Sequence, residues 1–418
     1  MFKSVFEKIG KILSSNFLFD KSIKLLYVIL SLYLGANFLN DEDFILLQQI
    51  NLFQSFLIFS ISIPVNAILI RIGNASLTYF NTIIPGVVLY RFSIGILSLV
   101  LLYIYFLTAN IDHFSTIIVG IIPTFISCVF FVDILPHVFN FEGKKNWNLI
   151  CIYGLLFIFK CLSIILLKSL HVKIGVEIFE IAVSSIWIYY TYLKKVLSLS
   201  YIRIFNSRVI KLIKSSFGLF LNGIFSVFIL RIDQFSLINL VDKRALSSYM
   251  LIVSISSLFL TPMTLLSERA GFTMSMAKSR SLKEFSLISK KSLYSFLFLS
   301  IILYIVFCIL INPLAIFVFK RNIHEFYLIA VILGTSIISN SIGMVFGQIN
   351  SISNGGMYTM KRTLIGCIIL FIGVRVGFHF YGIIGVALAS AFSLFFTNVI
   401  FWFFSKKIKR VVFFDVQK

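Results

Sequence analysis

Two ionisable residues lie deep inside a stretch of the sequence that is long and apolar enough to cross a membrane. Arg231 and Asp233 fall within Ser215–Asp242, and Arg231 precedes Asp242 by about 16 Å of helix, roughly half the hydrocarbon thickness of a bilayer. A charge at that depth is costly, so it usually has a partner, a hydrated cavity or a task. Arginine can bind an anion through two parallel hydrogen bonds, and a carboxylate can carry a proton.

The helical positions of these charges predict a segment that is polar on two sides. At about 100° per residue, Arg231 points away from a polar stripe formed by Gly218, Asn222, Ser226 and Asp233. Such a helix is best placed between two helical bundles, near a hydrated interior. In the alternative interpretation, Arg231 extends outward to lipid headgroups and Asp233 pairs with a neighbouring helix.

Three further cations lie within or beside apolar segments. Lys160 is near the middle of its segment, where a functional and a structural role are equally open. Arg375 lies a few residues from a segment end, which favours extension to headgroups. Arg91 lies near the cytoplasmic end of its segment, either as an anchor at the membrane surface or as a contact for a ligand entering from that side. Because Lys160 and Arg231 belong to different halves of the chain, a cavity between the halves would bring both to one anionic ligand.

Four carboxylates are candidates for ion coupling or for charge pairing. Glu177 and Glu180 are three residues apart on one helical face, and Asp133 lies four residues before His137. Together with Asp233 they can carry protons, because low-dielectric surroundings favour the neutral form of a carboxyl group. They can equally neutralise the buried cations, and the sequence leaves both roles open.

No catalytic or metal-binding constellation accompanies these charges. The sequence contains neither a phosphate-binding glycine loop nor a His-Glu-x-x-His motif, and its five histidines are scattered at segment ends. All five cysteines lie in apolar segments without metal-ligand spacing, and we interpret them as packing residues. We therefore expect movement of a molecule across a membrane, with no enzymatic activity, no metal site and no cofactor.

The composition indicates which elements must position these residues. The 418 residues have a mean hydropathy of +1.01, with 59% hydrophobic and only 13% charged residues. No soluble globular protein hides so much apolar surface, so the chain is expected to be an all-α polytopic membrane protein. A net charge of +21 need not indicate nucleic acid, because basic residues of membrane proteins mark the cytoplasmic side. The N-terminus lacks a small-residue cleavage site, so we expect no removed signal peptide.

Twelve apolar segments are expected to span the membrane, with both termini in the cytoplasm. Most of the 37 Lys and Arg residues fall in connections on one side, including two long basic connections, Lys194–Lys214 and Glu268–Ile288. The opposite side carries only Lys168, Lys173, Lys243, Arg244, Lys320 and Arg321. The segments are roughly 22–39, 44–70, 86–107, 114–139, 147–168, 173–193, 215–241, 245–267, 289–312, 325–347, 361–378 and 381–405.

The first long connection divides the spans into two halves of six. A weak internal repeat supports this division, because Pro64 and Pro262, and then Lys160 and Arg375, occupy corresponding segments. The predicted organisation is an amphipathic N-terminal segment (1–21), an N-terminal six-helix bundle (22–193), a basic linker (194–214), a C-terminal six-helix bundle (215–405) and a basic tail (406–418). The N-terminal segment is either a helix on the membrane surface or a loose basic leader.

Four short motifs point to a known family. They are Arg231-Ile-Asp233-Gln234 in the seventh segment, Ala245-x-x-x-Tyr249 opening the eighth, Leu39-Asn-Asp-Glu-Asp-Phe44 at the first external turn, and Tyr381-Gly-Ile-Ile-Gly-Val-Ala-Leu-Ala-Ser390 in the last. Together with the twelve segments they resemble Wzx-type O-antigen flippases, a polysaccharide branch of the multidrug/oligosaccharidyl-lipid/polysaccharide exporter superfamily. The resemblance extends over essentially the whole chain.

The resemblance implies two six-helix bundles, related by pseudo-two-fold symmetry, around a central cavity in the bacterial inner membrane. The implied cargo is an oligosaccharide repeat unit on undecaprenyl pyrophosphate, moved to the periplasmic leaflet by alternating access with H⁺ or Na⁺ as the coupling ion. Membrane lipid, a polymerase and a chain-length regulator are the implied partners, and nucleic acid is not. Residues expected to contact the pyrophosphate or glycan are Arg231, Lys160, Arg375 and Arg91, and the coupling or charge-partner carboxylates are Asp233, Glu180, Glu177 and Asp133.

The main alternative is a cation-coupled multidrug exporter of the same superfamily, which would favour a cavity dominated by carboxylates. A polymerase or ligase of the same pathway is disfavoured because those enzymes carry a large external loop, whereas every external connection expected in this chain is short.

Overall fold

The structure is a computed structural model. It describes residues 29–62 (except 31 and 34), 77–109, 114–129, 158, 162, 170–188, 190, 207–352 (except 239 and 322), 356–405, 408 and 411. All regular elements within these ranges are helices, as expected. The chain divides into two compact units, Met1–Gly223 and Ile224–Lys418, and each is considered by itself.

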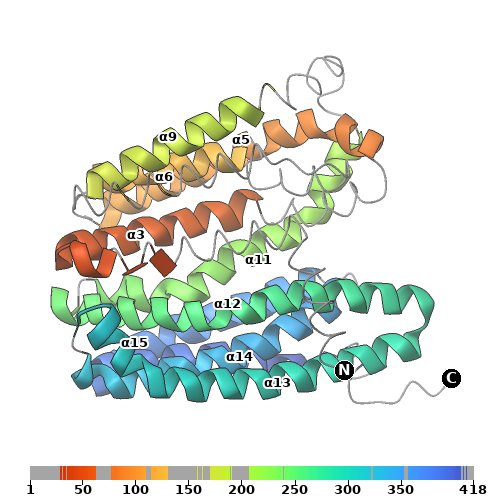
Figure 1. Ribbon diagram of the computed structural model, residues 1–418. Helices are drawn as coiled ribbons and strands as arrows, with labels where there is room; N and C mark the ends of the chain where they lie inside the picture. Colours follow the sequence, from red (N-terminus) through yellow and green to blue (C-terminus); the bar gives the residue numbers. More distant parts are fainter. Residues whose placement is uncertain are drawn as a thin grey trace. The chain divides into compact units, whose positions relative to one another are not determined.

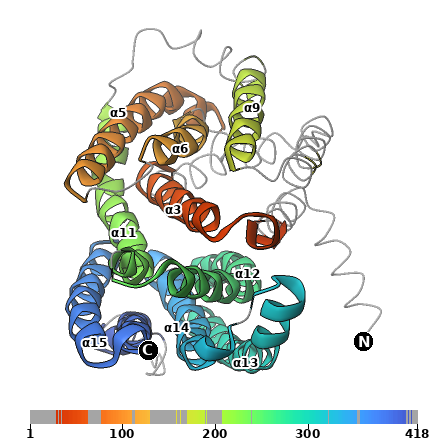
Figure 2. The same cartoon turned by 90° about the vertical axis from the view of Figure 1, so that its left-hand side faces the viewer.

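The first unit contains helices α3, α5, α6 and α9 and the beginning of α11 among its described residues. In this unit α6 packs against α3, α5 and α9 (Figures 1 and 2). The first four are α3 (Asp41–Leu57), continued by a π-helical turn over Ile58–Ser62, α5 (Leu77–Ala109), α6 (Phe114–Val129) and α9 (Leu170–Ile188).

The second unit consists of long helices. Helix α11 (Ser207–Leu237) crosses the boundary between the units, and α14 packs against α12, α13 and α15 (Figure 2). The others are α12 (Lys243–Arg280), α13 (Leu282–Pro313) with a π-helical turn over Leu314–Val318, a 3₁₀ turn over His324–Phe326, α14 (Tyr327–Ile352), α15 (Gly356–Asn398) and a 3₁₀ helix over Ile400–Phe404.

Six described helical stretches are long and apolar enough to cross a membrane. They are Ile83–Ile104, Phe220–Leu237, Lys243–Lys278, Leu282–Val318, His324–Ile352 and Met357–Phe404. Each coincides with a predicted span, and the last contains two of them. The predicted spans at 22–39, 44–70, 114–139, 147–168 and 173–193 lie wholly or partly outside the described residues.

The break between the last two predicted spans lies at Gly382. This residue has φ 57° and ψ −138°, a backbone conformation that only glycine adopts readily. The two halves of α15 meet just beyond it, because a Cβ atom added to Gly385 would collide with the backbone of Gly377. Two glycines of the motif Tyr381–Ser390 therefore permit the last helical hairpin. Gly382 adopts the conformation of the turn, and Gly385 has no side chain to keep the two halves apart.

The predicted long connection 268–288 is helical on both sides of Ser281. Helix α12 continues through it to Arg280, and α13 begins at Leu282. Between them, the hydroxyl of Ser281 accepts a hydrogen bond from the backbone N–H of Glu284 (3.1 Å), and the N–H of Ser281 donates to the carbonyl of Ala277 (3.0 Å). Ser-x-x-Glu is a helix-starting signature, so this basic stretch is a tight joint between two helices.

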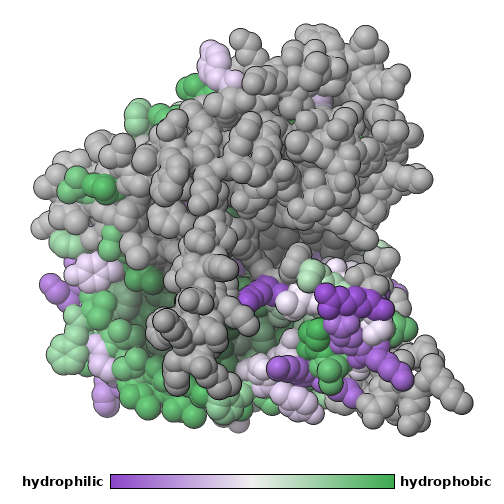
Figure 3. All heavy atoms as spheres, turned by 45° about the vertical axis from the view of Figure 1, so that its right-hand side comes forward, coloured by the Kyte–Doolittle hydropathy of each residue, from purple (hydrophilic) through white to green (hydrophobic). Residues whose placement is uncertain are grey.

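The joint extends the second unit well beyond a bilayer core. The 38 residues of α12 span about 57 Å, against roughly 30 Å of hydrocarbon. Exposed basic residues gather at this end, namely Arg269, Arg280, Lys283 and Lys291. Figure 3 shows groups of hydrophilic residues beside hydrophobic surface in the described part of the chain. Large apolar side chains of α13, such as Phe298 and Ile309, are exposed along its length, as expected for a lipid-facing helix.

Two predicted basic segments are described only in part. Residues 207–214 of the predicted linker form the beginning of α11 and run into the predicted span without a break. In the predicted tail, Ile408 is buried in an apolar cluster with Trp402 and Phe285, and the carbonyl of Val411 accepts a hydrogen bond from the hydroxyl of Ser286 (2.5 Å). The N-terminal segment 1–21 lies outside the described residues.

Candidate functional site in the C-terminal unit

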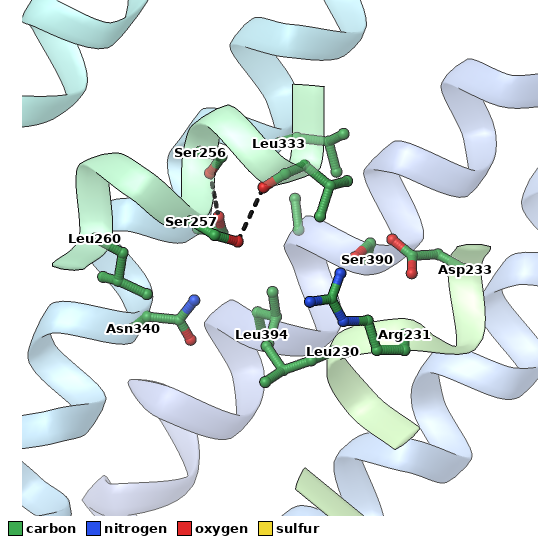
Figure 4. A pocket seen from close by; sticks show the side chains of 13 residues that line it. Leu230, Arg231, Asp233, Ser256, Ser257, Leu260, Leu333, Asn340, Ser390 and Leu394 are labelled. Carbon is green, nitrogen blue, oxygen red and sulfur yellow. Dashed lines mark hydrogen bonds between the residues drawn. The ribbon is translucent and has the colours of Figure 1, made fainter. Parts of the chain in front are cut away.

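Asp233 is held by hydrogen bonds from two helices. Its side chain is buried, with 2% of its surface exposed, and accepts a hydrogen bond of 2.6 Å from the hydroxyl of Tyr249 on α12. The backbone N–H of Gln234 donates to the other carboxylate oxygen (2.8 Å), and the hydroxyl of Ser390 on α15 lies close to the carboxyl group (Figure 4). Buried carboxylates need such donors because they lose their hydration shell. The recognised motif residues Asp233 and Tyr249 are therefore direct partners.

Arg231 lies beside Asp233 without a direct ion pair to it. One guanidinium nitrogen donates to the side-chain oxygen of Gln234 (3.3 Å), and Asp233 attracts the guanidinium only through space. Among the described residues no carboxylate forms a salt bridge with Arg231. The guanidinium therefore retains donors that point into the space in front of it (Figure 4).

That space is a partly open cavity of about 120 Å³, large enough to hold water molecules. Helices α11, α12, α14 and α15 contribute its walls, and the hydroxyls of Ser256 and Ser336 in the wall are hydrogen-bonded to each other at 3.3 Å. Its lining is Leu230, Arg231, Asp233, Val253, Ser256, Ser257, Leu260, Leu333, Ser336, Asn340, Ser390, Ala391 and Leu394.

The helical wheel predicted that Arg231 and Asp233 point to opposite sides of their helix. This prediction was wrong for the ends of the two side chains. Both side chains line the same cavity. The wheel gives only the direction of the Cα–Cβ bond, whereas the long side chain of Arg231 brings its guanidinium round to the side of Ser390 (Figure 4).

A chain of side-chain hydrogen bonds leads from this cavity towards the beginning of α15. Asn340, in the cavity wall, accepts a hydrogen bond of 2.7 Å from the amide of Asn398. The amide oxygen of Asn398 accepts from Arg362 (3.2 Å), whose guanidinium stacks over the ring of Trp402 at 4.8 Å. Asn340, Asn398 and Arg362 were not predicted as site residues. Their position in predicted apolar spans could have indicated them, because buried polar residues there are rarely kept without a role.

Arg375 and Arg91 are not among the described residues that line this cavity. Arg375 lies at a second pocket, near the turn at Gly382, with its guanidinium 4.6 Å from the ring centre of Phe371. Arg91 belongs to the first unit, where it is completely buried and donates to the carbonyl of Cys128 (2.6 Å). Total burial does not fit an anchor at the membrane surface, and the hydrogen bond gives Arg91 a role in joining α5 to α6.

Of the remaining predicted residues, Glu177 is half-buried on α9. Glu180 lies on the same helix, but its side chain is outside the described residues, as are Lys160 and Asp133.

Comparison with solved structures shows a transporter fold. An inward-facing multidrug resistance MATE family transporter of the MOP superfamily shares 13% identity, with 93% of this chain and 95% of that chain covered and a TM-score of 0.63. An outward-facing form gives the same identity and TM-score over 96% and 95% of the two chains. A MOP superfamily transporter from Pyrococcus furiosus, whose pocket is described as having reverse polarity that suggests a different function, shares 12% identity over 96% and 95%, with a TM-score of 0.66.

No protein-family model matches the chain, and no curated protein does. The chain therefore has the fold of MATE transporters of the MOP superfamily, and at these identities the likeness concerns the fold alone.

Proposed function

We propose that this protein is a flippase for undecaprenyl-pyrophosphate-linked oligosaccharide, which it moves from the cytoplasmic to the periplasmic leaflet of the bacterial inner membrane by alternating access. Two observations from different sources support this function. The fold is that of membrane transporters, and the motifs around Arg231, Tyr249 and Gly385 resemble those of Wzx-type flippases.

The observation that carries the proposal is a difference in hydrogen bonding between the two charged side chains of the cavity. Asp233 accepts hydrogen bonds from the hydroxyl of Tyr249 and from the backbone N–H of Gln234. Arg231 donates only a long hydrogen bond to a neutral amide and has no described carboxylate as an ion-pair partner. The charge left open to a ligand is therefore cationic, which suits a pyrophosphate, because a guanidinium binds phosphate oxygens in a bidentate manner.

The size of the cavity limits which part of the cargo it receives. A space of about 120 Å³ holds a few water molecules, which is the scale of a diphosphate group and too small for a saccharide of several sugars. The saccharide would lie beyond this cavity, and the polyprenyl chain would stay in lipid. The serine hydroxyls and Asn340 in the wall can hydrogen-bond to phosphate oxygens or to their water.

Asp233 is the residue of this site that suits ion coupling by H⁺ or Na⁺. It is a buried carboxylate in the cavity wall, and Tyr249 donates to it from another helix. A proton or cation at the carboxylate would weaken this bond and so change how α11 and α12 are held together. Asp233 also supports the alternative function, a cation-coupled multidrug exporter, in which the carboxylate itself would face a cationic drug.

Substitutions of Arg231 distinguish the flippase from the multidrug exporter, in purified protein reconstituted into liposomes. Translocation of a fluorescent prenyl-diphosphate saccharide should fall at least tenfold in Arg231→Ala, the effect of losing about 1.4 kcal/mol of binding, and Arg231→Lys should recover little. The matched control is Arg280→Ala, because Arg280 lies at the exposed joint and pairs with Glu284.

The double variant Arg231→Ala with Asp233→Ala tests whether the two charges serve only each other. If Arg231 binds the diphosphate, the double variant stays inactive; recovery of translocation would refute the proposal. Efflux of a cationic dye that survives Arg231→Ala but is lost in Asp233→Asn would favour the drug exporter instead.

A further inference from the structure

A second pocket lies at the end of the C-terminal unit where α11 ends and α15 turns back at Gly382. Its volume is about 470 Å³, several times that of the cavity at Arg231. Helix α11 and the first half of α15 form its walls, with Phe235, Ser236, Leu240, Val374, Arg375, Phe378 and His379. The distribution of basic residues predicts that this end of the unit is external.

The polar groups of this pocket lie along one face of α15. Arg375 and His379 are four residues apart, as are Phe371 and Arg375, so the three side chains follow one another along the helix. The guanidinium lies 4.6 Å from the ring centre of Phe371, and the ring of His379 meets that of Phe380 edge to face at 5.2 Å. Ser236 adds a hydroxyl from α11. These ring contacts limit the conformations of both side chains before any ligand arrives.

The pocket carries a positive charge without an internal counter-charge. No carboxylate is among its lining residues, and within the described part of the chain Arg375 forms neither an ion pair nor a hydrogen bond. An arginine that stacks on an aromatic ring keeps its N–H donors available at the edge of the guanidinium plane. The pocket therefore fits an anion with several acceptor oxygens.

The depth of the pocket indicates which anions are present there. Arg375 precedes the turn at Gly382 by seven residues, about 10 Å of helix, and Ser236 is next to the last residue of α11. The polar headgroup layer occupies roughly the outer 5–8 Å on each side of a bilayer. With the turn placed at the outer edge of this layer, Arg375 would lie just below the layer, and its long side chain would reach lipid phosphate groups.

We propose that this pocket binds the phosphate group of a lipid and serves as a release site, where the diphosphate of the translocated lipid is held after leaving the cavity at Arg231. The identity of the lipid rests on the proposed function. The bound chemistry, a phosphate ester or diphosphate at the membrane surface, rests on the pocket alone. Ordinary phospholipids carry the same chemistry, and the experiment separates the two sources.

The test places a photoreactive benzoylphenylalanine at Leu240, a half-exposed residue of the pocket, in the full-length protein in phosphatidylcholine nanodiscs. The probe is radiolabelled farnesyl diphosphate, with radiolabelled farnesol as the probe that lacks phosphate. We expect crosslinking to the diphosphate at least tenfold above farnesol and a comparable loss in Arg375→Gln. The control Arg244→Gln removes an exposed arginine outside the pocket, on α12, and should leave crosslinking unchanged.

The source of the phosphate is read from competition. If the pocket is selective for the cargo, crosslinking of farnesyl diphosphate persists in nanodiscs that contain phosphatidylglycerol. If the pocket accepts phospholipid headgroups, phosphatidylglycerol abolishes this crosslinking, and the proposal of a release site is overturned. Equal crosslinking of farnesol, or a signal that survives Arg375→Gln, would overturn phosphate binding itself. The two proposals can fail separately. If the unsubstituted protein does not translocate lipid-linked saccharide, but crosslinking occurs and persists in Arg231→Ala, the proposed function is refuted and the phosphate site is retained.

Discussion

Replacing Tyr249 with phenylalanine tests the central contact of the candidate site. The substitution removes only a hydroxyl from a fully buried ring, and with it the 2.6 Å hydrogen bond to Asp233. Hydrogen bonds between membrane helices contribute about 0.6 kcal/mol on average and up to about 1.7 kcal/mol. The bond from Tyr249 is short and ends on a carboxylate, which puts it near the upper value.

We therefore expect Tyr249→Phe to lower the free energy of unfolding by about 1.7 kcal/mol, roughly an 18-fold change in the unfolding equilibrium. The matched control is Tyr304→Phe in the same unit, because the Tyr304 hydroxyl donates a longer bond of 3.3 Å to the backbone carbonyl of Val331. This control should cost no more than about 0.6 kcal/mol. Reversible unfolding in mixed micelles, followed by circular dichroism, measures both values.

A double-mutant cycle with Asp233→Ala assigns the effect to the hydrogen bond. If the hydroxyl acts through the carboxylate, Tyr249→Phe should have almost no further effect in the Asp233→Ala background. The reasoning would be refuted if Tyr249→Phe destabilised both backgrounds equally, or if it cost no more than Tyr304→Phe.

Two further predictions follow from the structure. Asn398→Leu should slow translocation and destabilise the unit by about 1–3 kcal/mol, because it removes hydrogen bonds to Asn340 and to the buried cation Arg362; an unchanged unfolding curve would show that this polar chain contributes nothing. A reporter active only outside the cytoplasm should be active when fused after Val241 and silent when inserted at Ser281, and activity at Ser281 would invert the predicted orientation.

The class of protein could be predicted from the sequence because it depends on sums over many residues. A mean hydropathy of +1.01 cannot belong to a soluble core, and an apolar run of sufficient length must satisfy its backbone as a helix. Local chemistry similarly predicted the break near Gly382 and the unusual depth of Arg231 and Asp233. These features need no knowledge of neighbouring helices, and the described residues place the break at Gly382.

The connection predicted at 268–288 shows what the count of basic residues leaves open. The count indicates the side of the membrane on which the segment lies, but it does not show whether the segment is helical. In the structure its apolar residues Met274 and Phe285 are buried in the core at this end of the unit, while the lysines and arginines lie at its surface. The segment is therefore helical on both sides of Ser281, since its apolar face is buried.

The candidate site itself was decided by tertiary structure. The sequence identified Arg231, Asp233 and Tyr249, but it could not show that Tyr249 rather than Arg231 is bonded to Asp233. That partnership depends on how α11 and α12 pack, and a helical wheel contains no information about a second helix. The same holds for Asn340 and Asn398, which are 58 residues apart and bonded at 2.7 Å. Sequence determines which residues must be buried and how each helix repeats, whereas only the packing of the helices determines which buried charge is satisfied and which remains open to a ligand.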